Sequence, residues 1–301
     1  MSDASVLRHT LIGASALLLW STLAVTTVFA GGVPPFLMVG FAFFLAFLIG
    51  LAKWVVRGES ILGHMRQPWQ AWALGVCGLF GYHALVFYAL QAAPPLEANL
   101  VNYLWPLCIV LFSGFLPGHR LRWFHLAGTL SGLIGVILLV TGGGSVSFKP
   151  EALPGYLAAF GAALTWGAYS VLSRLMKAVP TDSVAAFCLV GSLLAFVCHA
   201  LFETGGWPQT PVQWGAVILL GLGPAGGAFF LWDLGMKRGD IQVLGALSYA
   251  TPLMSTLLLI LTGSGALSPM VAVACLMIVG GAALASKDML FRRKKEAVVA
   301  E

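Results

Sequence analysis

The sequence carries very little charge. Only 9% of its 301 residues are Asp, Glu, Lys or Arg, whereas 59% are hydrophobic. A soluble domain has about a quarter charged residues. The composition therefore excludes a soluble protein and predicts one that lies in a membrane.

Motifs for chemistry are missing as well. The sequence has no Gly-x-x-x-x-Gly-Lys phosphate loop. Its histidines and acidic residues are scattered, without the clustering that a metal site, an aspartate pair or a nucleophile with its base requires. We therefore expect no enzyme, no cofactor, no metal and no nucleic-acid partner. The five cysteines also lack ligand-like spacing and are predicted to be small core residues: Cys77, Cys108, Cys188, Cys198 and Cys275.

Long apolar runs dominate the sequence instead. A hydrocarbon layer of roughly 30 Å is crossed by about 20 helical residues. Strand-like alternation is absent, so the predicted fold is an all-α polytopic membrane protein with ten transmembrane helices. The predicted spans are 8–29, 33–55, 69–91, 95–117, 121–141, 152–176, 181–202, 211–236, 240–262 and 267–288.

The basic residues predict the topology. With ten spans, all of the 16 Lys and Arg residues except Lys149 fall on one side of the membrane. Positively charged loops stay in the cytoplasm during insertion. We therefore expect both termini to be cytoplasmic, in a multi-pass protein of a bacterial-type inner membrane.

An internal repeat appears when the chain is shifted by 146 positions. The shift aligns Trp20 with Trp166, Pro34 with Pro180, Phe41 with Phe187, Gly75 with Gly221, Tyr103 with Tyr249 and Pro106 with Pro252. Residues 1–145 and 146–301 would then each hold five helices, the second half ending in a basic cytoplasmic tail. An odd number of helices inverts the second copy, and inverted repeats are typical of secondary transporters. The alternative is a chance match of Gly and Pro, which are common in membrane helices.

A family resemblance covers essentially the whole chain. It rests on LLLWSTLAVTTV followed by VPPFLMVGF in the first half, and on ALTWGAYSVLSR followed by VP in the second. These segments resemble the drug/metabolite transporter (DMT) superfamily of EamA type, and EANLVNYLWPL is most similar to its aromatic amino acid exporters. The resemblance implies export of aromatic amino acids and related small metabolites, and the inverted repeat predicts alternating access. Two departures, the lack of an arginine after the first Pro-Pro and His119 in PGHRL, argue against transferring a coupling mechanism.

The segment EANLVNYLWPL also predicts a cavity. On a helical wheel, Asn99, Asn102, Tyr103 and Pro106 share one face. Pro106 has no amide proton and frees the carbonyl of Asn102, and Pro252 likewise frees that of Ser248. Freed carbonyls at membrane depth must be buried in protein or line a watery cavity.

Aromatic residues are predicted to meet at the membrane midplane. Counted from the helix ends, Trp20, Trp105, Trp166 and Tyr249 each lie about 12 to 20 Å deep, away from the interfacial belts that such residues usually occupy. They indicate an aromatic substrate cavity, with ordinary core packing as the alternative for any single ring. The predicted substrate-binding residues are Trp20, Tyr82, His83, Asn102, Tyr103, Trp105, Trp166, Tyr169, Ser248 and Tyr249.

Other polar and flexible positions have further interpretations, and two of them have alternatives. Glu97 either benefits from its helix N-terminus or attracts a substrate ammonium, and His83 is either a hydrogen-bonded neutral side chain or a proton relay. Asp233 and Lys237 read as a pair on a helix surface. The predicted hinges are Pro106, Pro252, Gly223 and Pro224.

Three functions remain open from the sequence. The first is an aromatic amino acid exporter and the second a broad metabolite or drug exporter of the same superfamily. A channel or purely structural membrane protein is the third. The expected partners are a small-molecule substrate and the lipid bilayer, and the expected state is a monomer.

Overall fold

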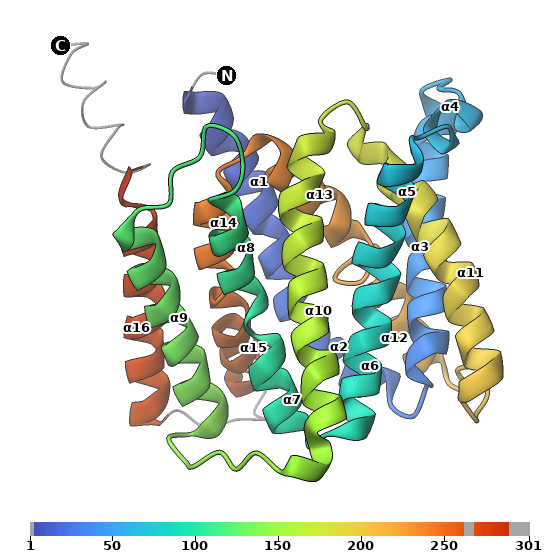
Figure 1. Ribbon diagram of the computed structural model, residues 1–301. Coiled ribbons are helices and arrows are strands. Elements are labelled where there is room, and N and C mark those ends of the chain that lie inside the picture. The colour runs from blue at the N-terminus through green and yellow to red at the C-terminus, as the bar shows by residue number, and fades with distance from the viewer. Residues whose placement is uncertain (1–2, 262–267, 289–301) are drawn as a thin grey trace.

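The computed structural model describes residues 3–261 and 268–288, and all regular elements within these ranges are helical. Figure 1 shows the long helices side by side in one bundle. The predicted outer loop at Gly265 and the basic tail residues Arg292, Arg293, Lys294 and Lys295 lie outside the described residues.

The first half of the chain forms nine α-helices within the described residues. In three cases two consecutive helices belong to the same apolar stretch. The nine are α1 (Asp3–Ser21), α2 (Leu23–Ala30), α3 (Pro35–Val56), α4 (Ile61–Met65), α5 (Trp69–Val76), α6 (Tyr82–Ala92), α7 (Pro95–Asn102), α8 (Trp105–Ser113) and α9 (Trp123–Thr141). A π-helical segment, Cys77–Gly81, joins α5 to α6.

The second half repeats this organisation. Its described helices are α10 (Leu153–Leu172), α11 (Val184–Phe202), α12 (Pro211–Leu222), α13 (Gly227–Arg238), α14 (Ile241–Leu247), α15 (Ala250–Leu261) and α16 (Pro269–Ala285). Short 3-10 segments cover Pro150–Ala152, Ser173–Met176 and Thr181–Ser183.

Membrane-spanning character is clear for most of these elements. Within the described ranges, eight helical stretches are long and apolar enough to cross a bilayer, and they match eight of the ten predicted spans. The other two predicted spans coincide with α10 and with the shorter apolar helix α16. The protein is therefore a multi-pass membrane protein, while the count of ten and the inverted arrangement stay predictions.

The helix contacts have a pattern that suits two similar halves. Helix α3 packs along α11, and α9 packs along α16. Helix α1 packs along α13, and α10 packs along α6. A shift of 146 positions turns α1 into α10 and α6 into α13, so it exchanges the last two pairs and leaves the first two unchanged.

Glycines allow several of these helices to come close together. A Cβ atom on Gly13 would lie 2.8 Å from the Cα atom of Gly235, where α1 crosses α13. A Cβ atom on Gly128 would lie 2.4 Å from the carbonyl oxygen of Gly281, where α9 crosses α16. Such close backbone approach is typical of membrane helices with small residues at the interface.

The glycines of the third predicted span admit aromatic rings rather than another backbone. A Cβ atom on Gly75 would lie 2.3 Å from the Phe187 ring, and one on Gly78 would lie 2.4 Å from the Tyr169 ring. These glycines therefore seat two side chains of the second half of the chain.

The helices are interrupted at corresponding places in the two halves. Helix α7 ends before Tyr103 and α14 ends before Ser248, each a few residues ahead of a proline, Pro106 or Pro252. The π-helical segment Cys77–Gly81 corresponds, at the same shift, to the break between α12 and α13. Both prolines lie in the first turn of the following helix and lack an amide proton, so neither can continue the hydrogen bonds of the helix that precedes it.

The two ends of the bundle differ in the charge of their loops. Figure 1 places the start of α1, helix α4, the loop between α8 and α9 and the end of α16 at the same end. These segments and the α10–α11 connection carry Arg57, Arg120, Arg122, Arg174 and Lys177, and we call this the basic end. Lys149 lies in the connection between α9 and α10, which Figure 1 shows at the opposite end.

Candidate functional site

Four tryptophan rings meet in the core of the bundle. Trp20 lies at the end of α1, Trp105 at the start of α8, Trp166 in α10 and Trp232 in α13. Their six ring-centroid distances run from 5.0 to 6.4 Å. Each ring therefore contacts the other three, and we call these four residues the tryptophan cluster. The two halves of the chain each contribute two of its rings.

Two indole N–H groups are anchored by hydrogen bonds. The Nε1–H group of Trp20 donates to the carbonyl oxygen of Pro224 at 2.9 Å, inside the break between α12 and α13. The Nε1–H group of Trp232 donates to the Ser170 hydroxyl at 3.0 Å. A buried indole N–H needs an acceptor, so these bonds fix the ring orientations. The first bond also links the cluster to a predicted hinge.

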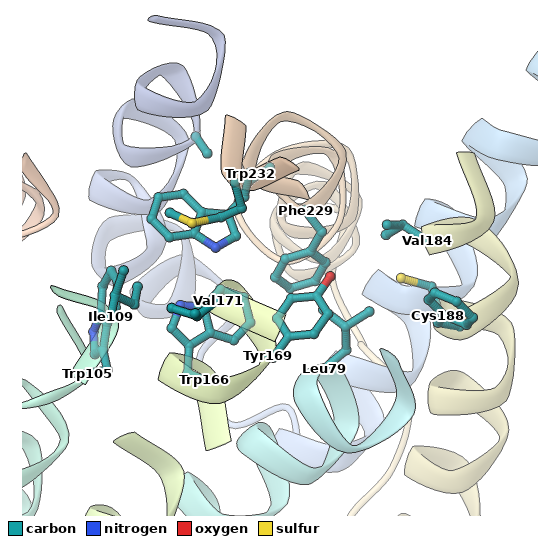
Figure 2. Packing of buried hydrophobic residues seen from close by; sticks show 14 of the residues in the cluster. Leu79, Trp105, Ile109, Trp166, Tyr169, Val171, Val184, Cys188, Phe229 and Trp232 are labelled. Carbon is teal, nitrogen blue, oxygen red and sulfur yellow. The ribbon is translucent and has the colours of Figure 1, made fainter. Parts of the chain in front are cut away.

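Further aromatic rings surround Trp166. The ring centroids of Tyr82, Tyr169 and Phe229 lie 5.1, 5.4 and 6.0 Å from that of Trp166. Figure 2 shows Tyr169 and Phe229 next to each other, with Trp166 and Trp232 beyond them and Trp105 on the far side. The hydroxyl of Tyr169 is buried without a hydrogen-bond partner. The whole region is suited to binding a flat ring by stacking and edge contacts.

Asn102 and Tyr82 form a polar pair beside these rings. The amide nitrogen Nδ2 of Asn102 donates to the Tyr82 hydroxyl at 3.2 Å. The amide oxygen Oδ1 of Asn102 is buried and has no partner. Asn102 thus lies against Tyr82, whose ring packs against that of Trp166.

His83 is held between helices. Its Nδ1 atom donates to the carbonyl oxygen of Leu79 at 2.7 Å, because a carbonyl oxygen can only accept. The imidazole ring lies 5.3 Å from the ring of Phe43 and 5.2 Å from that of Tyr82, both nearly at right angles. This geometry favours the first reading from the sequence, a hydrogen-bonded histidine, over a proton relay.

The remaining predicted site residues lie elsewhere. Tyr249 is fully buried, but in a separate group with Leu133, Leu253 and Ile278, against which Tyr103 also packs. The Ser248 hydroxyl donates to the carbonyl of Leu244 at 2.7 Å, so its proton is used within its own helix. Counting residues from the helix ends gives the depth of a residue along the membrane normal, but not its position in the membrane plane. For this reason these residues were predicted to lie with the tryptophans.

Trp232 and Phe229 were missed by the sequence analysis. The repeat shift pairs Trp232 with Val86, so the internal alignment gave no signal for it. The break before Gly227 starts a new helix, α13, whose direction the sequence does not reveal. The neighbouring acidic residue Asp233 inside an apolar span was the one available hint.

Asp233 and Lys237 correct another expectation. The pair was predicted on a helix surface, but the two side chains are only 3% and 7% exposed, and their Oδ2 and Nζ atoms lie 2.8 Å apart. The Thr181 hydroxyl donates to Asp233, and Lys237 donates to the carbonyl of Val179. The 177–183 connection covers this side of α13, which explains the burial.

The cysteine prediction is also corrected at one position. All five were predicted to be core residues, but Cys77 is exposed.

The region around Asp233 and Lys237 closes the basic end. The guanidinium of Arg174 donates to the carbonyl oxygens of Met236 and Gly239 at 3.0 and 2.6 Å, and so satisfies the last turn of α13. Leu116, in the loop between α8 and α9, packs into the hydrophobic cluster that holds the tryptophans. The segment 173–181 therefore holds the end of α13 in place, and the loop between α8 and α9 packs into the same hydrophobic cluster as the tryptophans.

The tryptophan cluster itself is closed in this conformation. Atoms in contact lie about 3.5 Å apart, so a flat guest stacked between two rings needs them about 7 Å apart. All six centroid distances are shorter than that. At least one ring must move before a substrate ring can enter.

Comparisons with known proteins find similar transporters. A protein of Ancylobacter novellus named aromatic amino acid exporter YddG is 54% identical over 285 residues, which are 94% of this chain and 98% of that protein. A biotin transporter of Escherichia coli K12 is 27% identical over 179 residues, 59% of this chain and 58% of that protein. One solved crystal structure, 53% identical in sequence, matches with a TM-score of 0.88 over 93% of this chain and 97% of that one.

The family match covers nearly the whole sequence. The EamA-like transporter family matches twice, over residues 8–141 and 153–287, and the second match ends 146 positions after the first. This result points to a transporter rather than an enzyme. The chain belongs to the EamA-like transporter family, and its relatives include proteins named aromatic amino acid exporters.

Proposed function

We propose that this protein exports aromatic amino acids and related small metabolites across the inner membrane by alternating access. The observation that carries the proposal is the tryptophan cluster, in which each half of the chain supplies two of four mutually contacting rings. A site between the halves suits a transporter in which the two copies change places in conformation.

The chemistry of the cluster favours an aromatic substrate without net charge. The described groups that bond to or stack on the four rings are aromatic rings, a serine hydroxyl and a backbone carbonyl. Aromatic pairs contribute roughly 0.5 to 1.5 kcal/mol beyond area burial. A zwitterionic amino acid with an aromatic side chain matches this combination of stacking and uncharged polar groups.

Alternating access is supported by the helix interruptions. The breaks at Tyr103–Leu104, Gly223–Gly226 and Ser248–Tyr249 lie in spans that contact the cluster or flank it. Pro106, Gly223, Pro224 and Pro252, the predicted hinges, all lie at or just after these breaks. Bending there would open the cluster to one end of the bundle and then to the other.

The proposed orientation places the basic end in the cytoplasm. The positive-inside rule favours it, since the loops at that end carry most of the described Lys and Arg residues. The repeat between residues 1–145 and 146–301, with ten spans, belongs to the same proposal. A cysteine placed just after Lys287 should be inaccessible to membrane-impermeant reagents added to intact cells.

A broad metabolite exporter is the second candidate. It is favoured by the partial match to a biotin transporter, whose named substrate is not an amino acid. The tryptophan cluster would then bind apolar parts of many substrates. A channel is the third candidate, and it lacks support because the rings are packed against one another.

Transport by purified protein in liposomes tests all three. We expect saturable uptake of labelled phenylalanine that is inhibited by tryptophan and tyrosine but not by alanine or leucine. Equal inhibition by aliphatic amino acids would favour the broad exporter, and uptake that never saturates would favour the channel. Repeating the assay with a pH gradient shows whether proton movement drives transport.

A further inference from the structure

Asn102 and Tyr82 extend the tryptophan cluster with polar atoms. Asn102 is the last residue of α7, three positions before Trp105, and Tyr82 opens α6 with its ring 5.1 Å from that of Trp166. A ligand ring that contacts Trp105 or Trp166 would therefore have its polar end within reach of this pair.

The hydrogen bond between the two residues leaves both an unused donor and an unused acceptor. Asn102 uses an Nδ2 proton to reach the Tyr82 oxygen. The Tyr82 hydroxyl still has its own proton to donate, and the Asn102 amide still has the lone pairs of Oδ1 to accept with. That Oδ1 atom is buried without a partner, which costs free energy unless a ligand completes it.

The surroundings of the pair hold few other polar groups. A crevice between α6, α7 and α10 reaches Asn102 and is lined by Val86, Ala98, Asn99 and Ala159, among others. The ring of His83 meets that of Tyr82 edge-on at 5.2 Å, and its Nδ1 proton is already donated to Leu79. The unpaired oxygen is therefore available to a polar group that enters the site.

We propose that Asn102 and Tyr82 recognise the α-amino and α-carboxylate groups of the substrate. An amino acid presents an ammonium donor and a carboxylate acceptor on one carbon, and the pair offers an acceptor, Asn102 Oδ1, and a donor, the Tyr82 hydroxyl. The substrate ring would stack in the tryptophan cluster, one methylene away. This inference rests on the proposed function and adds which residues select free amino acids over other aromatic compounds.

Three ligands and two variants test the assignment. The ligands are phenylalanine, phenethylamine, which lacks the carboxylate, and 3-phenylpropionate, which lacks the ammonium group. We expect Tyr82→Phe to bind phenylalanine about 10- to 100-fold more weakly, as for a lost hydrogen bond to a charged group, and to bind phenethylamine as before. Asn102→Leu should lose phenylalanine affinity to the same extent and bind 3-phenylpropionate as before. Tyr88→Phe, on the exposed side of α6, is the control and should change nothing.

The outcomes separate this inference from the proposed function. If the unmodified protein binds no aromatic amino acid in a calorimetric titration, the proposed function fails. If it does bind, but each variant weakens all three ligands equally or none at all, the assignment of Asn102 and Tyr82 is overturned. Asn102→Asp guards against misfolding, because it keeps the side-chain shape and an acceptor. Its negative charge should favour the ammonium ligand. The ratio of its affinity for phenethylamine to that for 3-phenylpropionate should therefore be larger than in the unmodified protein.

Discussion

At the scale of single residues, Trp166 is the centre of the site. Its ring contacts those of Trp20, Trp105 and Trp232 as well as Tyr82, and its side chain is only 4% exposed. Every aromatic pair it makes can be exchanged for a pair with a substrate ring at little net cost. Under the proposed function, this exchange is how an aromatic substrate would enter the closed cluster.

Truncation of this ring gives the first prediction. Trp166→Ala removes several stacking partners at once, so we expect the affinity for phenylalanine to fall about 10-fold or more while the protein still inserts into the membrane. Binding and uptake in liposomes measure the effect. Trp69→Ala is the matched control, since Trp69 is 74% exposed and should be replaceable. Unchanged transport in Trp20→Ala, Trp105→Ala and Trp166→Ala would mean that the rings only pack.

The buried ion pair gives the second prediction. Asp233→Asn leaves the Lys237 charge without its partner in a site that is 7% exposed, which should lower the free energy of unfolding by about 3 to 5 kcal/mol. The double variant Asp233→Asn with Lys237→Met should recover most of this loss. Thermal unfolding in detergent measures both. Asp288→Asn, which breaks the exposed pair with Arg122, should change stability very little.

At the scale of helices, the interruptions of the helices position the tryptophans. Helices α7 and α8 form one span with a break at Tyr103–Leu104, and α8 begins with Trp105 directly after this break. The α12–α13 break holds Pro224, whose carbonyl accepts the Trp20 hydrogen bond. A change in backbone conformation at either break therefore moves a tryptophan. Conversely, a tryptophan that moves displaces the backbone at a break.

Healing a break gives the third prediction. Pro106→Ala supplies an amide proton for the carbonyl of Asn102 and favours a continuous helix through the break. We expect the maximal transport rate to fall about 10-fold, equivalent to roughly 1.4 kcal/mol on the barrier, with substrate affinity nearly unchanged. Pro252→Ala should act in the same way. Pro154→Ala, in the first turn of α10 where no amide bond is missing, is expected to transport normally, and an equal loss in this control would contradict the hinge role.

At the scale of the whole molecule, the two ends of the bundle differ. The basic end is held by Arg174, Thr181 and Lys237 around the end of α13, and by the contact between the Gln242 side chain and the carbonyl of Arg120. Toward the opposite end, Tyr82 and Asn102 are only partly buried. Contacts between helices hold the opposite end as well, where the Glu203 carboxylate accepts from the amides of Phe36 and Leu37.

Locking the basic end gives the fourth prediction. A disulfide between Arg120→Cys and Gln242→Cys, in a background without the native cysteines, should hold the basic end shut. We expect oxidation to abolish transport and a reducing agent to restore it, because alternating access requires this end to open. Each single-cysteine variant should respond to neither treatment. Transport that continues in the locked protein would rule out alternating access and favour the channel.

Much of this architecture follows from local sequence properties. Hydrophobicity acts segment by segment, so multi-pass membrane character was predictable from composition, whereas the family was predictable only from the resemblance of short motifs such as EANLVNYLWPL. The convergence of Trp20, Trp105 and Trp166 could also be foreseen, because depth in a membrane is nearly a function of position along a helix.

The sideways arrangement was decided by tertiary packing alone. Trp232 joins the cluster and Tyr249 does not because helix rotation and the break before α13 set which face points inward, and neither leaves a pattern in one sequence. The same holds for Asp233 and Lys237, which are buried by a connection distant in the chain. The sequence by itself thus determined that Trp20, Trp105 and Trp166 come together, while the packing of α13 against α1 and α10 added Trp232 to them.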